Sequence, residues 1–199
     1  GCNFYKDTDV PLLKMNDEDV EMLESDLLTL QSMVTSRYQH FKRQSVAWQS
    51  SLTNVGECYT LLSEMQRMWS YLEPLFIGSE EVKKELPEDT AHFKAIDVQV
   101  KEILASSWDS RNVRKAFNVE GLQGRLEALQ ADQEKCKKSL ADFLDGKRRI
   151  FPRFYFTSEA DLLDILSNGS QPKKILKHVD KVLLATKQLK LDPSICERS

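Results

Sequence analysis

The sequence has few of the residues that build phosphate-binding and catalytic sites. Its seven glycines form neither a GxGxxG pattern nor a GxxxxGK[ST] loop, so the backbone cradle that holds nucleotide phosphates is missing. Its three histidines, His40, His92 and His178, are widely separated. The sequence shows no nucleophile paired with a general base and no pair of carboxylates placed for acid–base catalysis. We therefore expect no catalytic, cofactor-binding or metal-ligating residues.

Cysteine is also sparse and scattered. Cys2, Cys58, Cys136 and Cys196 form no CxxC pair, a pattern that fits reduced cytosolic thiols better than a disulfide framework or a zinc site. No run of 18 apolar residues is present, so no transmembrane helix is expected. The chain opens on Gly1 without a methionine or a signal-peptide pattern, as a fragment would.

The charge balance is almost neutral. The 199 residues include 28 basic and 31 acidic side chains, a net charge of −3, so nothing attracts a polyanion in bulk. Nucleic acid and membrane are therefore not expected as partners. Hydrophobic residues make up 41% of the chain, which is the composition of a folded protein. We expect an extended lead-in over residues 1–15, one helical segment over 16–191, and a tail over 192–199.

Apolar and large residues recur in steps of three and four over a long stretch. They are Leu23, Leu27, Leu30, Val34, Tyr38, Phe41, Trp48, Leu52, Val55, Tyr59, Leu62, Trp69, Leu72 and Phe76. Such spacing is typical of the packed face of a helix. It predicts one near-continuous helix ending near Pro74, which we favour, or two helices meeting near residues 50–56.

Shorter helices are predicted to follow, over residues 79–86, from Pro87 to about residue 107, and from Gly121 onward. Two more are expected over about 159–167 and 172–186. The predicted fold class is all-α, an elongated bundle of long helices. At most one small two-stranded β ribbon is expected, pairing residues 154–156 with 188–191.

The segment 147–158 concentrates basic and aromatic side chains. Pro152 should end the incoming helix at Phe151, and Thr157 or Ser158 can cap the next one. The aromatics at residues 154–156 favour an extended segment. We predict a buried helix–strand–helix corner, with at least two of Phe151, Phe154 and Phe156 largely buried. A basic–aromatic nucleic-acid site is the alternative, but the aromatics are bunched rather than spaced along a groove.

Two groups of cations have simple explanations. Lys147, Arg148 and Arg149 fall at a predicted helix C-terminus, where positive charge is favoured; a salt-bridged contact with another domain is the alternative. Lys173, Lys174 and Lys177 are interpreted as a solvated helix face.

Several separate motifs resemble one family. They are Trp69-x-Tyr-Leu-Glu-Pro-Leu-Phe, Glu-Leu-Pro-Glu at residues 85–88, Phe93 with Asp97, Leu140-x-x-Phe-Leu-x-x-Lys-Arg, Phe-Pro-Arg-Phe-Tyr-Phe at 151–156, and Asp-Leu-Leu-Asp-Ile-Leu-Ser at 161–167. In this order they resemble the linker region of dynein heavy chains, and the axonemal outer-arm type best. The structural signature comprises Trp69, Leu72, Phe76, Phe151, Pro152, Phe154, Tyr155 and Phe156.

The resemblance implies a mechanical role. The family's linker is a helical arm that bends and straightens across a ring of AAA+ modules to produce the power stroke along a microtubule in cilia and flagella. It implies that ATP and Mg²⁺ are bound by the ring, which is absent here, and that the chain meets microtubules only through the complete motor. Possible ring contacts are Arg148, Arg149, Lys173, Lys174 and Lys177. Residues 74–79 and 109–121 are the candidate hinges.

A spectrin-like or coiled-coil scaffold is the alternative function. It explains the helices equally well, but it should show an internal repeat, and none is visible. It would also not require the corner at residues 147–158.

The isolated chain is predicted neither to bind nor to hydrolyse ATP, because no phosphate-binding loop is present among its glycines. Calorimetric titration with Mg-ATP should give no binding heat. Stoichiometric binding at micromolar affinity would contradict the prediction.

Overall fold

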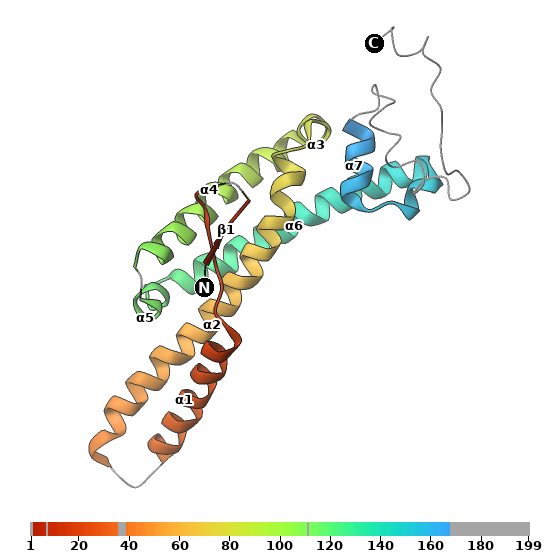
Figure 1. The fold of residues 1–199 in the computed structure, drawn as a ribbon. Coiled ribbons are helices and arrows are strands. Elements are labelled where there is room, and N and C mark those ends of the chain that lie inside the picture. The colour runs from red at the N-terminus through yellow and green to blue at the C-terminus, as the bar shows by residue number, and fades with distance from the viewer. Residues whose placement is uncertain (1, 7, 36–38, 111, 168–199) are drawn as a thin grey trace, which may run out of the picture. The chain divides into compact units, whose positions relative to one another are not determined.

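The computed structural model describes residues 2–6, 8–35, 39–110 and 112–167 (Figure 1). The elements are β1 (Cys2–Phe4), β2 (Pro11–Leu13), α1 (Asp17–Thr35), α2 (Gln39–Phe76), α3 (Glu80–Glu85), α4 (Pro87–Asp109), α5 (Val113–Phe117), α6 (Leu122–Ile150), the 3₁₀ helix η1 (Pro152–Phe156) and α7 (Glu159–Ser167). The all-α fold class is confirmed, because the described residues contain a single short ribbon beside these helices.

Contacts divide the chain into two compact units. The first comprises Gly1–Ser70 and Ile96–Gln133, and the second comprises Tyr71–Ala95 and Glu134–Ser199. Helices α2, α4 and α6 each contribute residues to both units. The candidate hinge 74–79 lies within the second unit and the candidate hinge 109–121 within the first; both stay predictions.

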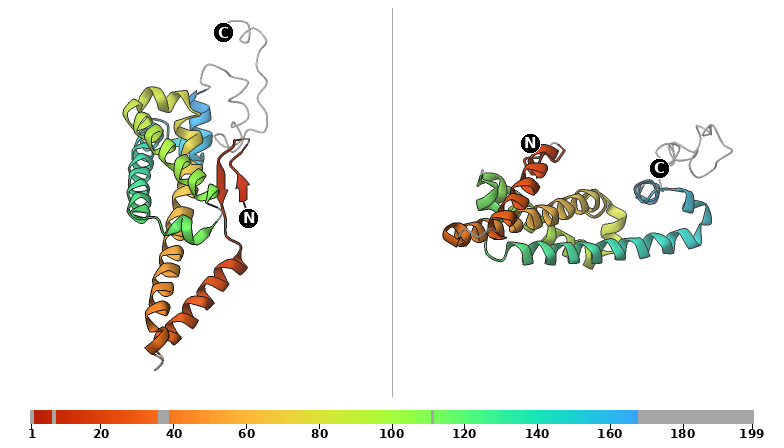
Figure 2. Two further views of the ribbon diagram at one scale, coloured as in Figure 1. Left: turned by 90° about the vertical axis from the view of Figure 1, so that its left-hand side faces the viewer. Right: turned by 90° about the horizontal axis from the view of Figure 1, so that it is seen from below.

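The expected near-continuous helix is wrong, because α1 ends at Thr35 and α2 begins at Gln39. The alternative break near residues 50–56 is also wrong, since α2 runs through this stretch with Gly56 in its interior. Figure 1 shows α1 running back along the first half of α2, and the left view of Figure 2 shows the two helices spreading apart from their adjacent ends. A Cβ on Gly56 would lie 3.7 Å from Leu23 Cδ2. A long helix needs a packing partner for its apolar stripe, and this reversal supplies one.

The ribbon lies in the predicted lead-in and is fastened to α2. Strands β1 and β2 are antiparallel, with Asn3 opposite Leu12. The side-chain amide of Gln66 accepts from the backbone N–H of Leu13 at 3.2 Å and donates to its carbonyl at 2.7 Å. Gln66 interrupts the apolar stripe of α2 because it holds this strand edge.

The ribbon predicted at residues 154–156 is wrong, since these residues belong to η1. Its proposed partner strand, 188–191, lies outside the described residues.

The first unit is built around Trp69, whose side chain is fully buried. Its indole Nε1–H donates to Asp97 Oδ1 at 2.9 Å, and the Tyr5 ring packs on it with centroids 4.6 Å apart. Asp97 Oδ2 also pairs with Lys101 at 2.7 Å. These contacts join the segment after β1 to helices α2 and α4.

The second unit has its own core. Phe76 stacks on Phe93 with ring centroids 5.0 Å apart and planes 17° apart. Buried side chains from α2, α3, α6 and α7 include Leu72, Val82, Leu140, Leu144, Leu162 and Leu163. A Cβ on Gly78 would lie 2.5 Å from the Pro74 carbonyl oxygen, so the turn after α2 requires glycine.

Local start signals in this region are confirmed. Ser79 caps α3 by accepting a hydrogen bond from the Val82 N–H, and Pro87 opens α4, where a first-turn proline loses no helical hydrogen bond.

Replacement of Asp97 by alanine should destabilise the chain by about 1–3 kcal/mol, because it leaves the buried Trp69 N–H without an acceptor. Lys101→Ala is the matched control. It removes only the partly exposed ion pair and should cost about 0.5 kcal/mol or less. Urea unfolding of the two variants measures the difference, and equal losses would show that the indole hydrogen bond contributes little.

Candidate docking surface at the end of helix α6

Helix α6 ends at Ile150, and the chain turns through η1 into α7. Pro152 sits at the start of η1, where its fixed φ and missing N–H are tolerated. The Phe154 N–H then donates to the Phe151 carbonyl at 2.9 Å, and the Thr157 N–H to the Phe154 carbonyl at 3.1 Å. The predicted helix end is confirmed, while the predicted extended segment is wrong.

The prediction that the aromatics of this turn are buried is also wrong. Phe151 is 59% exposed and Phe156 70% exposed, and Phe154 is half-buried. A 3₁₀ helix has three residues per turn, so the side chains of residues 154, 155 and 156 point in three different directions, and of these three only Phe154 is half-buried. The centroid of its ring lies 5.5 Å from that of the Phe151 ring.

Arg148 stabilises the turn through bonds to two residues of the same unit. Its Nη1 lies 3.2 Å from Asp145 Oδ1, and its Nη2 donates to the Thr157 carbonyl at 3.3 Å. Its side chain is 16% exposed. This predicted contact residue therefore has an intramolecular role in the second unit.

The start of α7 follows the predicted capping pattern. Ser158 Oγ accepts from the Asp161 N–H at 3.2 Å and donates to Asp161 Oδ2 at 2.7 Å. The neighbouring Thr157 is buried, and its hydroxyl donates to the Phe154 carbonyl at 2.6 Å. Of the two residues predicted as caps, Ser158 is the cap and Thr157 locks the turn before it.

The remaining cations differ in accessibility. Lys147, Arg148 and Arg149 occupy the last turn of α6, as predicted, and the Lys147 ammonium lies 5.1 Å from the Phe143 ring centroid. Arg149 and Arg153 are exposed. The lysines predicted as contacts, Lys173, Lys174 and Lys177, lie outside the described residues.

The structural signature thus separates into two kinds of residue. Trp69, Leu72 and Phe76 are fully buried core residues. Phe151, Pro152, Tyr155 and Phe156 are exposed, and Phe154 is half-buried.

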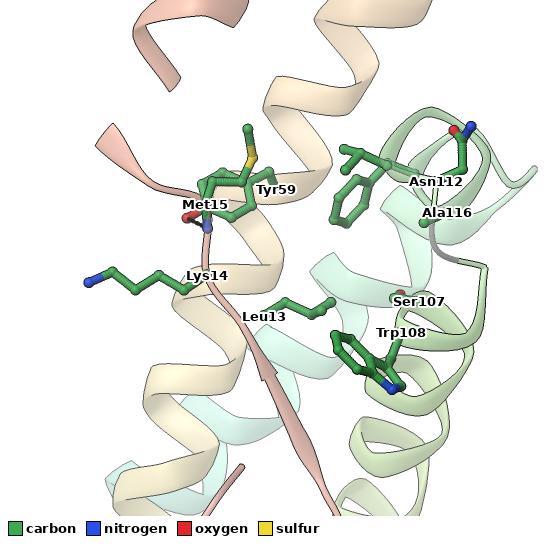
Figure 3. A pocket seen from close by; sticks show the side chains of 10 residues that line it. Leu13, Lys14, Met15, Tyr59, Ser107, Trp108, Asn112 and Ala116 are labelled. Atoms are coloured by element: carbon green, nitrogen blue, oxygen red, sulfur yellow. Dashed lines mark hydrogen bonds between the residues drawn. The ribbon is translucent and has the colours of Figure 1, made fainter. Parts of the chain in front are cut away.

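Sequence reasoning missed an apolar groove in the first unit. It has a volume of about 490 Å³ and is lined by Leu13, Lys14, Met15, Tyr59, Ser107, Trp108, Asn112, Val113, Ala116 and Phe117. Figure 3 shows that these side chains come from the end of the ribbon and the residues after it, from α2, from α4, and from α5 and the residue before it. No short motif could reveal the groove, because its walls come from segments far apart in the sequence.

The described residues offer little reactive chemistry. They contain no group of three or more His, Cys, Asp or Glu side chains placed to hold a metal ion. Burial raises the pKa of the Cys58 thiol, and the carboxylates of Glu57 and Glu127 raise it further, so the neutral and poorly nucleophilic thiol is favoured. Among the described helices, none combines the length and apolarity needed to cross a bilayer.

Comparison with known proteins defines the class of this helical chain. Residues 2–198 match the family model described as dynein heavy chain, N-terminal region 2, so the chain belongs to the dynein heavy chain family. Three of its relatives are named as flagellar, ciliary and axonemal dynein chains. It is 46% identical over 94% of its length to the dynein alpha chain of the flagellar outer arm of Chlamydomonas reinhardtii, and 44% identical over 88% to the ciliary dynein beta chain of Heliocidaris crassispina.

A human relative, dynein axonemal heavy chain 9, is 40% identical over 94% of this chain. These matches confirm the resemblance to axonemal dynein heavy chains. The chain spans about 4% of the length of each of the three relatives.

Substitution of the exposed Phe156 by alanine should change the free energy of unfolding by about 0.5 kcal/mol or less. Leu162→Ala, at a fully buried position of α7 in the same unit, should cost about 2–5 kcal/mol. Denaturant unfolding of the isolated chain compares the two. A loss of similar size at both positions would show that the turn is packed like the core.

Proposed function

We propose that this chain is part of the linker of an axonemal dynein heavy chain, a mechanical element that moves across an AAA+ ring during the ATP cycle. The observation that carries the proposal is the match of residues 2–198 to N-terminal region 2 of dynein heavy chains. In this proposal the complete motor drives microtubule-based motility in the axoneme of cilia or flagella.

The helical construction supports a mechanical role. Helix α2 has 38 residues and α6 has 29, lengths of about 57 Å and 44 Å at 1.5 Å per residue. Bending such helices strains their backbone hydrogen bonds and the side chains packed between them. In the first unit, the partly buried Trp69–Asp97 hydrogen bond joins α2 to α4. An element that transmits force needs this kind of stiffness.

The proposal assigns no catalysis to this chain. ATP and Mg²⁺ are bound by the AAA+ ring elsewhere in the same heavy chain, and that ring is the linker's partner. Microtubules are met only through the complete motor, and neither nucleic acid nor membrane is a partner. Arg149, Lys173, Lys174 and Lys177 remain the proposed ring contacts, while Arg148 acts chiefly through its bonds to Asp145 and Thr157.

A complete axonemal heavy chain carrying this segment tests the proposal. A donor fluorophore at residue 98, which is exposed, and an acceptor on the ring should change their energy transfer between the ATP-bound and nucleotide-free states. An unchanged transfer efficiency through the nucleotide cycle would exclude the linker role.

A second measurement asks whether stiffness matters. Trp69→Ala in the same motor should lower microtubule gliding velocity severalfold while basal ATPase persists, because it removes about 3–5 kcal/mol of packing from the first unit and leaves the ring intact. Val98→Ala, at an exposed position one residue from Asp97, is the control. Normal gliding with Trp69→Ala would argue against force passing through this core.

A further inference from the structure

The turn after α6 carries a dense group of exposed apolar side chains. Ile150, Phe151, Tyr155 and Phe156 lie within seven residues, and each is more than half exposed. We call these four residues, together with Arg149 and Arg153, the aromatic corner. Large apolar side chains that gather on a surface mark interaction sites more often than isolated ones do, and aromatic and arginine residues dominate the energetics of such sites.

The charge of the corner has one sign. Between Gly146 and Ser158 the sequence has four cations and no carboxylate. Arg148 is engaged by Asp145 and Thr157, whereas Arg149 and Arg153 are exposed and form no ion pair with another described residue. A complementary surface must therefore be acidic beside these two guanidinium groups and apolar opposite the rings.

The flanks of the corner carry the opposite charge. Helix α7 begins with Glu159 and Asp161 and continues to Asp164, and α6 carries Asp142 and Asp145 before the turn. A flat anionic membrane or a nucleic-acid backbone would meet these carboxylates together with the arginines, and repulsion would offset part of the attraction. A folded protein surface can match both signs locally, so the pattern favours a protein partner.

We propose that the aromatic corner docks on an acidic protein surface with an apolar hollow, located elsewhere in the same heavy chain. This inference rests on the proposed linker function and names the contact for it. The chain spans about 4% of its relatives' length, so most potential surfaces are tethered to it, and tethering raises the effective concentration of the partner. Because the partner is tethered, a small contact can form even though each of its exposed ion pairs is weak. The same weakness allows the contact to dissociate.

Photo-crosslinking in the complete heavy chain tests the contact. The photoreactive residue p-benzoylphenylalanine replaces Tyr155, and a matched control places it at Lys138, an exposed residue of α6 in the same unit. Irradiation should join residue 155, but not residue 138, to a carboxylate-rich peptide of the same heavy chain. Peptide mapping identifies the partner.

Charge reversal gives the second arm. Arg149→Glu combined with Arg153→Glu should lower the crosslinking yield roughly fivefold or more, since attraction becomes repulsion at two exposed pairs, whereas Lys138→Glu should leave it unchanged. Raising the salt concentration should also lower the yield. Unchanged circular dichroism and melting temperature of the isolated variant chains exclude unfolding as the cause.

The proposal is overturned if residues 155 and 138 crosslink equally, or if charge reversal has no effect. It is also overturned if the crosslinks reach only a separate protein, lipid or nucleic acid. These outcomes are distinct from failure of the linker function. Nucleotide-dependent energy transfer can persist while the crosslink is absent, and in that case the corner alone is excluded.

Discussion

The partly buried hydrogen bond between the Trp69 indole and Asp97 is the interaction on which the first unit depends. The N–H of a buried tryptophan usually has a hydrogen-bond acceptor, and Asp97 on α4 supplies one while Lys101 balances its charge. Tyr5 closes the site through its ring and through the bond from its hydroxyl to the Ser70 carbonyl, 3.2 Å away. The position of the ribbon therefore follows from the same core, and Gln66 needs to hold only the strand edge.

Features set by local rules could be predicted from the sequence. Ser79, Pro87 and Ser158 start helices through their own backbone and hydroxyl chemistry, and Pro152 marks the end of α6. The reversal between α1 and α2 could not be predicted, because the apolar spacing continues across it and no proline or glycine marks it. Gly56, the one helix-weakening residue in that stretch, lies inside α2 opposite Leu23. The approach of Leu23 to Gly56 forms only in the folded chain, so the spacing of apolar residues does not show where the first helix ends.

The candidate site shows a different limit of the sequence. Aromatic residues favour strands only where a pleated surface and a partner strand are available, and residues 154–156 instead follow a proline that opens a 3₁₀ turn. The sequence shows the composition of the turn and the basic end of α6. It does not show which side chains face the protein. Arg148 illustrates this best. The sequence groups Arg148 with Arg149, yet its neighbours in the structure are Asp145 and Thr157.

The two halves of the structural signature suit two different mechanical demands. Trp69, Leu72 and Phe76 are fully buried, and moving them apart would expose apolar surface at about 25 cal/mol per Å², so they resist deformation. Phe151, Tyr155 and Phe156 are already exposed to water. A contact made through them is stabilised only by the apolar surface that the partner covers. In the proposed linker role, a stiff interior would transmit force, and a weak contact would release in every cycle. Under these two proposals, the burial of an aromatic side chain, rather than its residue type, decides whether it stiffens the core or forms a contact that can release.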